Sequence, residues 1–328
     1  MANPVIYASN MAWLGVGKEG STTYGTPAAA PTFWVPILSP AWMPSIKVIT
    51  DEALRGSMAK VYGASNGPRS DKLTYQTYPF LDSLFPHMLA LLGGADTVTG
   101  SADPYVHTTS LLNTGNGQPP SYTLWLYNGA ECWQMPGSLC AKVEVDLPAQ
   151  ELGKVSVEWI GLPATSVSAP TNTPSTASPW PGVNAVATIG GVSSTRFSDI
   201  KLTYTRAVEA VFTATGSYAP YTIFGGEVTA DLDLTGVYAG YSGSELNKLI
   251  SNTHPAVVVT CNAVNDATHT AQWQHTSMTA LSAEPKINVG KYVTIDSKWS
   301  GIANATDATA GGVSPVNFSI KSAQSTAW

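Results

Sequence analysis

The sequence predicts a mainly β protein, because long segments alternate apolar and polar residues while few segments have helical periodicity. Residues 142–147, 154–160 and 227–234 each place apolar side chains at alternate positions. This period of two is typical of strands that pack one face on a core and expose the other face to water. We therefore expect antiparallel sheets with one packed and one wet face, and a small helical content.

Five shorter segments complete the expected sheets. They are rich in β-branched or aromatic residues, which fit a pleated and half-buried surface, and turn-forming residues lie nearby. They are residues 122–127, 200–205, 210–215, 256–261 and 291–295.

The first of two predicted helices covers residues 79–92. Its apolar residues recur at helical spacing and form a single stripe. Pro79 suits a first-turn position, and Gly93 suits the stop at the C-terminal end. Pro86 is expected to kink the middle of the helix, because it lacks a backbone N–H group and its ring clashes with the preceding turn.

The second predicted helix covers residues 244–251. Ser242 and Glu245 have the spacing of a capping box, in which two side chains satisfy backbone groups at the start of a helix. The expected buried face consists of Leu246, Leu249 and Ile250.

Irregular segments divide the chain. Residues 1–36 contain four prolines and suit an extended N-terminal arm, and residues 164–182, rich in Pro, Ser and Thr, suit a linker or an exposed loop. Between and after them lie a first half at residues 37–163, which includes a polar segment at 50–71 long enough for a projecting hairpin, and a second half at residues 183–328. Each half holds one helix and at least one long hairpin, as a duplicated unit would. Residue identity between the halves is too weak to establish a duplication.

The composition favours a subunit of an assembly. Only 12% of the 328 residues are Asp, Glu, Lys or Arg, about half of the roughly 25% that is usual for a soluble domain. Charged residues are depleted in the cores of interfaces, so a chain that buries much of its surface against copies of itself needs fewer of them. Secreted β proteins rich in Ser, Thr and Gly have similar compositions, so this feature alone does not separate the two classes.

Charge and cysteine content argue against several other classes. The formal net charge of −6 disfavours general binding of nucleic acid through a basic surface. Cys132, Cys140 and Cys261 are odd in number and form no C-x-x-C pair, so we expect unpaired thiols rather than a metal or redox site. The first residues lack the basic and apolar regions of a signal peptide. The longest apolar run, residues 88–92, is far too short to span a membrane, which requires about 20 residues.

Gly15, Gly17 and Gly20 fit the dinucleotide-binding pattern G-x-G-x-x-G. That site requires a strand before the pattern, a helix after it and an acidic residue about 20 positions further on. The residues that follow include Pro27, which disfavours a helix, and the next acidic residue after the pattern, Asp51, lies too far along the chain. We interpret the glycines as the flexible start of the N-terminal arm, and we predict no cofactor.

Two further patterns carry little functional information. His269 and His275 would lie about 20 Å apart on a strand, which is too far to share a metal ion. The ten tryptophans would suit stacking on sugar rings, but they are scattered singly, and packing in the core or at an interface explains them.

Carboxylates form the most informative candidate site. They fall on the polar positions of two predicted hairpins, so each hairpin presents them on its wet face. A retaining glycosidase needs two carboxyl groups about 5–5.5 Å apart, and same-face neighbours on a strand lie roughly 7 Å apart, so a catalytic pair is one alternative. A solvated sheet face and a single acidic wall shared by both hairpins are the others. The residues are Glu144, Asp146, Glu158, Glu227, Asp231 and Asp233.

Five stretches, taken in order, resemble the tail tube proteins of long-tailed bacteriophages. Residues 13–37 are similar to the glycine-punctuated opening of that family, and residues 51–56 (D-E-A-L-R-G) are similar to the start of its long loop. Residues 78–94 resemble the family's helix with its terminal glycine. Residues 135–161 and 198–220 resemble its two hairpins. Each motif is only moderately specific, and their succession over most of the chain carries the resemblance.

The resemblance implies a tail-tube β-sandwich or barrel with a flanking α-helix. Subunits of this family assemble as rings, usually hexamers, which stack into a hollow tube, and their inner sheets join into one continuous β-barrel around the lumen. The sequence leaves open a ring of six chains or a ring of three whose duplicated halves mimic six. Two inner hairpins in each of six subunits would supply 24 strands, and a barrel of that size is about 48 Å across.

The resemblance also implies a structural virion protein of the phage tail rather than an enzyme, made and assembled in the cytoplasm of the host bacterium. The expected partners are copies of the chain, the terminator, tape measure and distal tail proteins, and double-stranded DNA that passes through the lumen without sequence-specific binding. An acidic lumen wall would repel the phosphates of that DNA. A β-rich carbohydrate-binding or adhesin-like module is the leading alternative, and a glycosidase is the third.

Two groups of residues are expected to make contacts between subunits. The charged residues of the 50–71 segment are expected at contacts between rings, the alternative being an ordinary mobile loop: Glu52, Arg55, Lys60, Arg69 and Asp71. The glycine-rich segment is expected to approach a neighbouring subunit closely, through Gly15, Gly17, Lys18, Gly20 and Tyr24.

Overall fold

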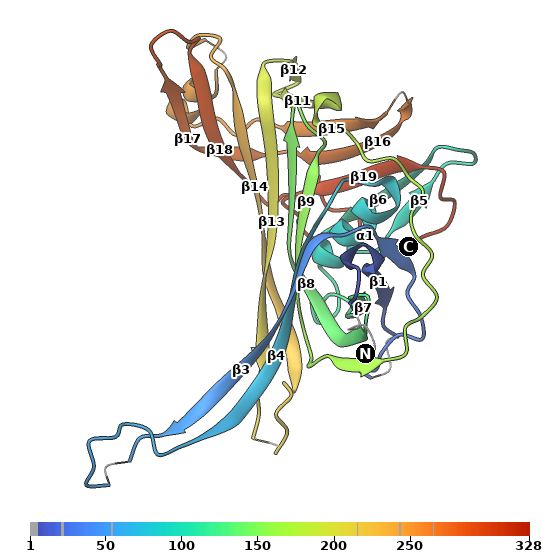
Figure 1. The fold of residues 1–328 in the computed structure, drawn as a ribbon. Coiled ribbons are helices and arrows are strands. Elements are labelled where there is room, and N and C mark those ends of the chain that lie inside the picture. The colour runs from blue at the N-terminus through green and yellow to red at the C-terminus, as the bar shows by residue number, and fades with distance from the viewer. Residues whose placement is uncertain (1–5, 21–22, 54, 215, 243, 265) are drawn as a thin grey trace.

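The chain folds into antiparallel β-sheets packed around one long helix, so the prediction of a mainly β protein is confirmed (Figure 1). The helices among the described residues are two α-helices, α1 (Leu81–Leu92) and α2 (Glu245–Ile250), and two short 3-10 helices, η1 (Ser9–Met11) and η2 (Gly182–Asn184). The computed structural model describes residues 6–20, 23–53, 55–214, 216–242, 244–264 and 266–328.

Eight strands form one continuous antiparallel sheet, here called the long sheet, in the order β3-β4-β9-β8-β13-β14-β18-β17. The two hairpins predicted to carry the acidic residues, β8–β9 and β13–β14, lie side by side at its centre. The strands are β3 (Leu38–Asp51), β4 (Gly63–Thr77), β8 (Cys132–Pro148), β9 (Lys154–Gly161), β13 (Phe197–Val211), β14 (Thr222–Val237), β17 (Met278–Lys286) and β18 (Thr294–Gly301).

Strand β8 belongs to two layers. Its C-terminal part pairs with β9 and β13 in the long sheet, whereas its N-terminal part pairs with β7 and β10. Gly137 lies between the two parts with a φ of 60°, a left-handed conformation that glycine adopts without strain. The strands of this branch are β1 (Trp13–Lys18), β2 (Phe33–Val35), β7 (Tyr122–Tyr127) and β10 (Thr165–Val167).

A separate sheet of seven strands covers the other side of the core, in the order β12-β11-β15-β16-β19-β6-β5. Figure 1 shows it packed across the upper part of the long sheet. Its strands are β5 (Thr97–Thr99), β6 (Tyr105–Ser110), β11 (Ala185–Ile189), β12 (Val192–Ser194), β15 (Val257–Ala263), β16 (Asp266–His275) and β19 (Asn317–Ser322).

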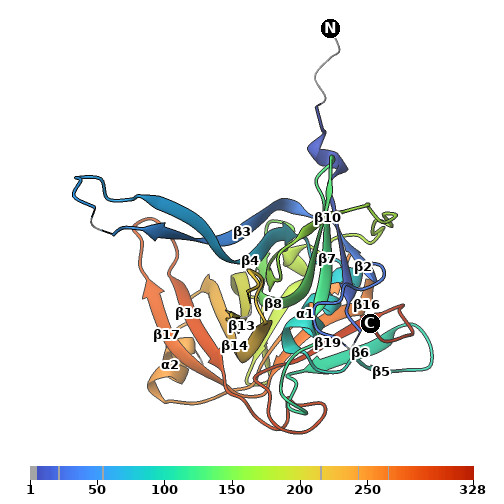
Figure 2. The same ribbon diagram turned by 90° about the horizontal axis from the view of Figure 1, so that it is seen from below.

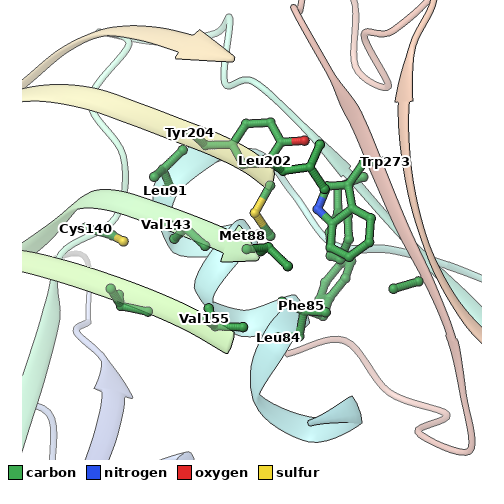
Figure 3. Packing of buried hydrophobic residues seen from close by; sticks show 14 of the residues in the cluster. Leu84, Phe85, Met88, Leu91, Cys140, Val143, Val155, Leu202, Tyr204 and Trp273 are labelled. Carbon is green, nitrogen blue, oxygen red and sulfur yellow. The ribbon is translucent and has the colours of Figure 1, made fainter. Parts of the chain in front are cut away.

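Helix α1 fills the space between the two sheets. Figure 3 shows Phe85 and Met88 of the helix between Val143 of the long sheet and Trp273 of the seven-stranded sheet, and all four side chains are completely buried. Burial of one such apolar side chain contributes about 1.5–3 kcal/mol. The apolar stripe predicted from the sequence therefore holds the layers of the protein together.

The first predicted helix is confirmed with a later start. Helix α1 begins at Leu81, after Phe80 in extended conformation, rather than at Pro79. It ends as predicted at Gly93, whose φ is 70° and whose N–H donates to the Leu89 carbonyl. Pro86 lies inside the helix and is buried.

The second predicted helix exists, and Leu249 packs against the core as expected, but its cap and the burial of Ile250 were predicted wrongly. Ser244, not Ser242, is the N-cap, and its hydroxyl accepts the Asn247 N–H at 3.2 Å. Glu245 is completely buried and pairs with Arg196 instead of closing a capping box. Ile250, which was expected to be buried, is 64% exposed, because the helix ends there at the surface.

Two predicted strand boundaries were also wrong. Strand β13 continues without a break to Val211, so residues 210–211 end it and residues 212–214 lie outside any strand. Strand β18 begins only at Thr294, because Gly290 turns the chain with a φ of 76°.

A buried cation secures the end of α1. Arg206 is 3% exposed, and its guanidinium donates to the carbonyls of Leu91 at 2.7 Å, Leu92 at 3.0 Å and Gly226 at 3.1 Å. The carbonyls at a helix C-terminus have no intrahelical partner and attract a positive charge. Burial lowers the pKa of Arg206 to about 10, so the group stays charged at neutral pH and attaches α1 to the bulge of β13.

Replacement of Arg206 is expected to destabilise the protein strongly. Arg206→Ala removes three guanidinium hydrogen bonds, which leaves the Leu92 carbonyl with only the Leu112 N–H as donor, and should lower the free energy of unfolding by about 2–4 kcal/mol in urea denaturation of the protomer. Arg206→Lys should recover only part of the loss, because an ammonium group cannot bond all three carbonyls in the same fork. Arg55→Ala, at a 56% exposed side chain, is the control and should change stability by less than about 0.5 kcal/mol. Equal effects of Arg206→Ala and Arg55→Ala would contradict the role of Arg206.

Candidate functional site

The solvent face of the long sheet carries the predicted acidic residues. Asp146 on β8 lies opposite Lys201 on β13, and Lys201 lies opposite Asp233 on β14. Directly paired residues share a face of the sheet, so the two predicted hairpins do form one charged surface. Five of the predicted residues lie in this central region, and Glu227 is exposed further along β14 near its bulge. The five are Glu144, Asp146, Glu158, Asp231 and Asp233.

Lysines are interleaved with these carboxylates, so the surface carries both signs of charge rather than the predicted acids alone. Lys72 pairs with Glu158 at 2.6 Å, and Glu144 bonds both Lys142 at 2.7 Å and Lys201 at 2.9 Å. The sequence positions of the lysines were visible, but their proximity to the acids depends on which strands pair. We call this surface the mixed-charge face.

The lysines hold Glu144 in its ionised form. Burial by itself would raise the pKa of Glu144, but hydrogen bonds from Lys142 and Lys201 lower it below its usual value. The same contact with Glu144 raises the pKa of Lys201. Both Glu144 oxygens are engaged by lysines, an arrangement that suits a fixed structural charge rather than a general acid.

Asp199 is the exception on this face. Burial, then a hydrogen bond with Asp146 and the charge of that residue, raise the pKa of Asp199 to about 6. Ionisation of Asp199 in this position therefore costs free energy. Asp199 was not among the predicted site residues, because its contact with Asp146 arises only from the pairing of β8 with β13.

The β3–β4 hairpin reaches away from the rest of the chain, as the projecting hairpin predicted at 50–71 should (Figures 1 and 2). It is longer than expected, since its strands run from Leu38 to Thr77. Glu52, Arg55 and Lys60 lie at its tip, where Arg55 pairs with Asp51 and Lys60 approaches Glu52 at 3.8 Å. Leu54 of the D-E-A-L-R-G stretch lies outside the described residues.

Asp71 is not available for contacts between rings, and that part of the prediction was wrong. Its side chain is completely buried, and its carboxylate accepts hydrogen bonds from Arg69, from the Trp42 indole at 3.0 Å and from the Ala164 N–H at 2.9 Å. An Asp carboxylate has room for only a few donors, and these come from its own chain. Arg69 and Asp71 thus fix the base of the hairpin.

Sequence reasoning missed the apolar surface of this hairpin. Met43, Ile46, Val48 and Ile49 are each at least 42% exposed on β3, and Met58 near the tip is fully exposed. Exposed apolar side chains gathered on one hairpin favour an interaction site there. The I-K-V-I stretch was visible in the sequence, but its exposure depends on the hairpin leaving the body of the protein.

The glycine-rich segment is not a free arm. Gly15, Gly17 and Lys18 lie in β1, which pairs with β2 and β7 of the same chain. A Cβ on Gly15 would lie 2.7 Å from the Pro31 ring, and one on Gly17 would lie 2.6 Å from the Ala30 carbonyl. The glycines are therefore required because the chain folds back closely over β1. Residues 1–5 and 21–22 of the predicted arm lie outside the described residues.

The last two residues of this predicted group behave differently. Gly20 is exposed with open space around it. The Tyr24 hydroxyl donates to the Gly137 carbonyl at 2.7 Å and accepts the Ile223 N–H at 2.9 Å, so it connects the bend of β8 to β14. Burial raises the pKa of Tyr24 to about 12.

The loop predicted at 164–182 is anchored at both ends. Strand β10 pairs with β8 at its start, and Trp180 near its end is 1% exposed and donates its N–H to the Pro79 carbonyl. The three cysteines are unpaired and buried, as expected. Among the helices that the structure describes, none has the length and hydropathy required to cross a bilayer.

Stability is expected to depend on Asp199 in a pH-dependent way. Its pKa is raised from 3.8 to about 6 in the folded protein, so the folded state holds more protons between about pH 4 and pH 6. The free energy of unfolding contributed by this group therefore falls as pH rises through that window. Asp199→Asn should raise the melting temperature above pH 6 and leave it unchanged near pH 4.

Asp296→Asn is the control, and its effect on stability should depend on pH in the opposite direction. Its pKa is lowered by Lys286, so the variant should lose stability at neutral pH and approach the wild type in acid. Thermal melts of both variants between pH 4 and pH 8 measure the effect. A constant difference between Asp199→Asn and the wild type would contradict the proximity of Asp146 and Asp199.

Comparison with protein families identifies the chain. Residues 10–319 match the family described as phage tail tube protein, which is nearly the whole length. No curated protein matches the chain at a significant level. A match over almost the full length, on a fold whose long hairpins and helix lie where the resemblance places them, shows that this chain belongs to the phage tail tube protein family.

Proposed function

We propose that this structural tail protein polymerises as stacked rings into the tube of the phage tail and that the tube conducts the genome into the host. Membership of the tail tube family supports a role in the tail. The observation that carries the conduit is the mixed-charge face, a broad polar surface on a sheet whose central strands pack their opposite face on the core. A tube needs one such wet surface inside, and apolar surfaces for contacts between subunits.

The mixed-charge face is the proposed lumen wall. Carboxylates outnumber lysines on it, so its average potential is negative, and Lys72, Lys142, Lys201 and Lys286 are each held by a neighbouring acid. A wall of this kind repels phosphates, and because most of its lysines are already paired it offers few cations to hold them, so DNA slides past. Besides the five central acids, its charged residues are Asp199, Glu284, Asp296, Lys72, Lys142, Lys154, Lys201, Lys286 and Lys298.

The β3–β4 hairpin is the proposed contact between rings. Its tip extends beyond the body of the protomer and combines exposed apolar residues with Glu52, Arg55 and Lys60. In an assembled tail the end rings would also contact the terminator, tape measure and distal tail proteins. These partners follow from the family and from the proposed tube.

Purified protein is expected to form rings or tubes. Negative-stain electron microscopy of the concentrated full-length chain should show hollow particles with a central channel. A stable monomer that binds glycans would contradict the proposal and support the alternative of a carbohydrate-binding or adhesin-like module.

Reversal of charge in the lumen is expected to slow genome ejection. Virions that carry Asp231→Lys together with Asp233→Lys should have tails of normal length, because these side chains lie on the wet face and not in the core. Their DNA ejection, followed by a fluorescent DNA dye after receptor addition, should slow by about tenfold, because the added cations bind phosphates. Glu131→Lys, in the turn between β7 and β8, is the control and should not affect the rate. Unchanged ejection through normal tails of the double variant would show that this face does not line the lumen.

A further inference from the structure

We propose that the chain consists of two topologically equivalent halves, and that the free edge strands β3 and β17 pair between neighbouring chains to close a ring of three. This inference rests on the proposed ring assembly and adds the number of chains and the strands that join them. Within one chain, β8 of the first half pairs with β13 of the second half. The proposed interface is the equivalent strand pair formed between two chains.

The pairing pattern of the first half repeats in the second. In the first half β1 pairs with β2 and β7, and β8 pairs with β7 and β10. In the second half β11 pairs with β12 and β15, and β16 pairs with β15 and β19. The long sheet repeats as well, since β3-β4-β9-β8 has the same order and connections as β13-β14-β18-β17, with a helix after the second strand of each. Single strand β8 corresponds to β16 and β17 together.

The register repeats with the same irregularities. In β8–β9 the register shifts after Cys140 pairs with Trp159, and in β17–β18 it shifts after Ala280 pairs with Trp299, each residue 140 positions later. Bulges are specific features of a strand pair rather than random defects. A shared bulge therefore aligns the two halves residue by residue.

The first hairpins share a second irregularity. In β3–β4 the register shifts after Ile46 pairs with Arg69, and in β13–β14 it shifts after Arg206 pairs with Val228. Once the halves are aligned in this way, identical residues appear at equivalent positions. They are Trp133 and Trp273, Gln134 and Gln274, Glu144 and Glu284, Trp159 and Trp299, and Gly161 and Gly301.

One junction lacks its counterpart within the chain. Strand β8 of the first half pairs with β13 of the second half. The equivalent pair is β17 with β3, but within the described residues β17 pairs only with β18, and β3 only with β4. These two strands are the opposite edges of the long sheet, so the pair can form only between chains.

Apolar residues that are buried at the β8–β13 junction have exposed counterparts on the free edge strands. Leu147 on β8 is 2% exposed beside β13, whereas its counterpart Ile287, just after β17, is 84% exposed. Val145 and Tyr204 are completely buried at the junction, and their counterparts Pro285 and Pro44 are exposed. A second chain that repeats the junction would cover this apolar surface.

The number of strands selects three chains. Eight strands per chain in a ring of three give 24, a barrel about 48 Å across at a strand spacing of about 4.8 Å and a tilt of about 40°. A ring of six such chains would have 48 strands and a diameter of about 96 Å. Duplex DNA is about 20 Å wide, so only the smaller ring surrounds it closely once side chains fill the wall.

Prolines on both free edges limit pairing with wrong partners. In the proposed register Pro285 lies opposite Trp42 of the neighbouring chain, and Ala283 lies opposite Pro44 of that chain. Proline has no N–H to donate, and edge strands use it to avoid indiscriminate pairing. The remaining donors and the apolar contacts then favour the one neighbour whose edge is complementary.

A disulfide tests the register. The Ala149 N–H donates to the Ser198 carbonyl at 2.9 Å, so counting along the ladder makes Asp146 and Lys201 a non-hydrogen-bonded pair. Their counterparts at the proposed interface are Lys286 and Ala41. Such pairs have Cα atoms about 4.5 Å apart, within the range that a disulfide requires.

Tubes assembled from the full chain with Ala41→Cys and Lys286→Cys are expected to give a covalent ring of three after mild oxidation, seen on a non-reducing gel and lost on reduction. Ala41→Cys with Ser282→Cys is the matched control and should not cross-link, because those positions would lie about 13 Å apart. Cross-linked rings of six, or assembled tubes without cross-links, would overturn the proposal.

Ile287→Lys provides an independent measurement. The side chain is already exposed, so the protomer should fold and keep its circular dichroism spectrum, while the fraction in rings should fall by at least tenfold. Val192→Lys, at a 71% exposed residue of β12, should assemble normally. Normal assembly of Ile287→Lys would overturn the edge contact. A wild-type chain that forms no rings at all would instead contradict the proposed function.

Discussion

The main-chain ladder between β8 and β13 is the contact on which the rest of the structure depends. It joins two four-stranded units into one sheet, and its residues Val145 and Leu202 are completely buried opposite each other. An antiparallel sheet remains stable only if its backbone groups are paired and one face is covered. The β8–β13 ladder pairs the backbone groups, and α1 with the seven-stranded sheet covers one face. The mixed-charge face exists because this ladder brings the acids of one hairpin beside the lysine of the next.

This chain has few charged residues, and those that are buried have partners within the protomer. Buried carboxylates have donors within the protomer, as Asp71 has from Arg69 and Glu19 has from the Ser121 and Thr123 hydroxyls and the Gly137 N–H, each at 2.7 Å. Buried charges without such partners would cost several kcal/mol. The other charged residues are divided between the mixed-charge face and further surfaces such as the tip of the β3–β4 hairpin. A low charged fraction is what a subunit with large contact surfaces would have, since charged residues are depleted in interface cores.

Open sheet edges place opposing demands on a tube subunit. Unpaired N–H and C=O groups favour association, yet a chain that paired with any strand would aggregate before the tail forms. The free edges here combine exposed apolar residues with prolines, so they favour a specific neighbour over random strands. The projecting β3–β4 hairpin also combines features that favour and limit association. Its exposed apolar side chains lie among ion pairs such as that of Arg55 with Asp51.

Local patterns were sufficient to predict the main strands, helix α1 and its stop at Gly93, and the parity that puts Glu144 and Asp233 on a wet face. These features depend on neighbours a few residues away, which the sequence displays directly. The return of β1 onto β7 and the burial of Asp71 could not be predicted, because they depend on partners far along the chain. The same holds for the lysines opposite the acids and for the two free edges, since strand order and register are decided by long-range packing. The sequence by itself determined which positions of regular strands such as β8 and β14 face water, and only the tertiary structure decided what those side chains contact, because strand order and register depend on residues far along the chain.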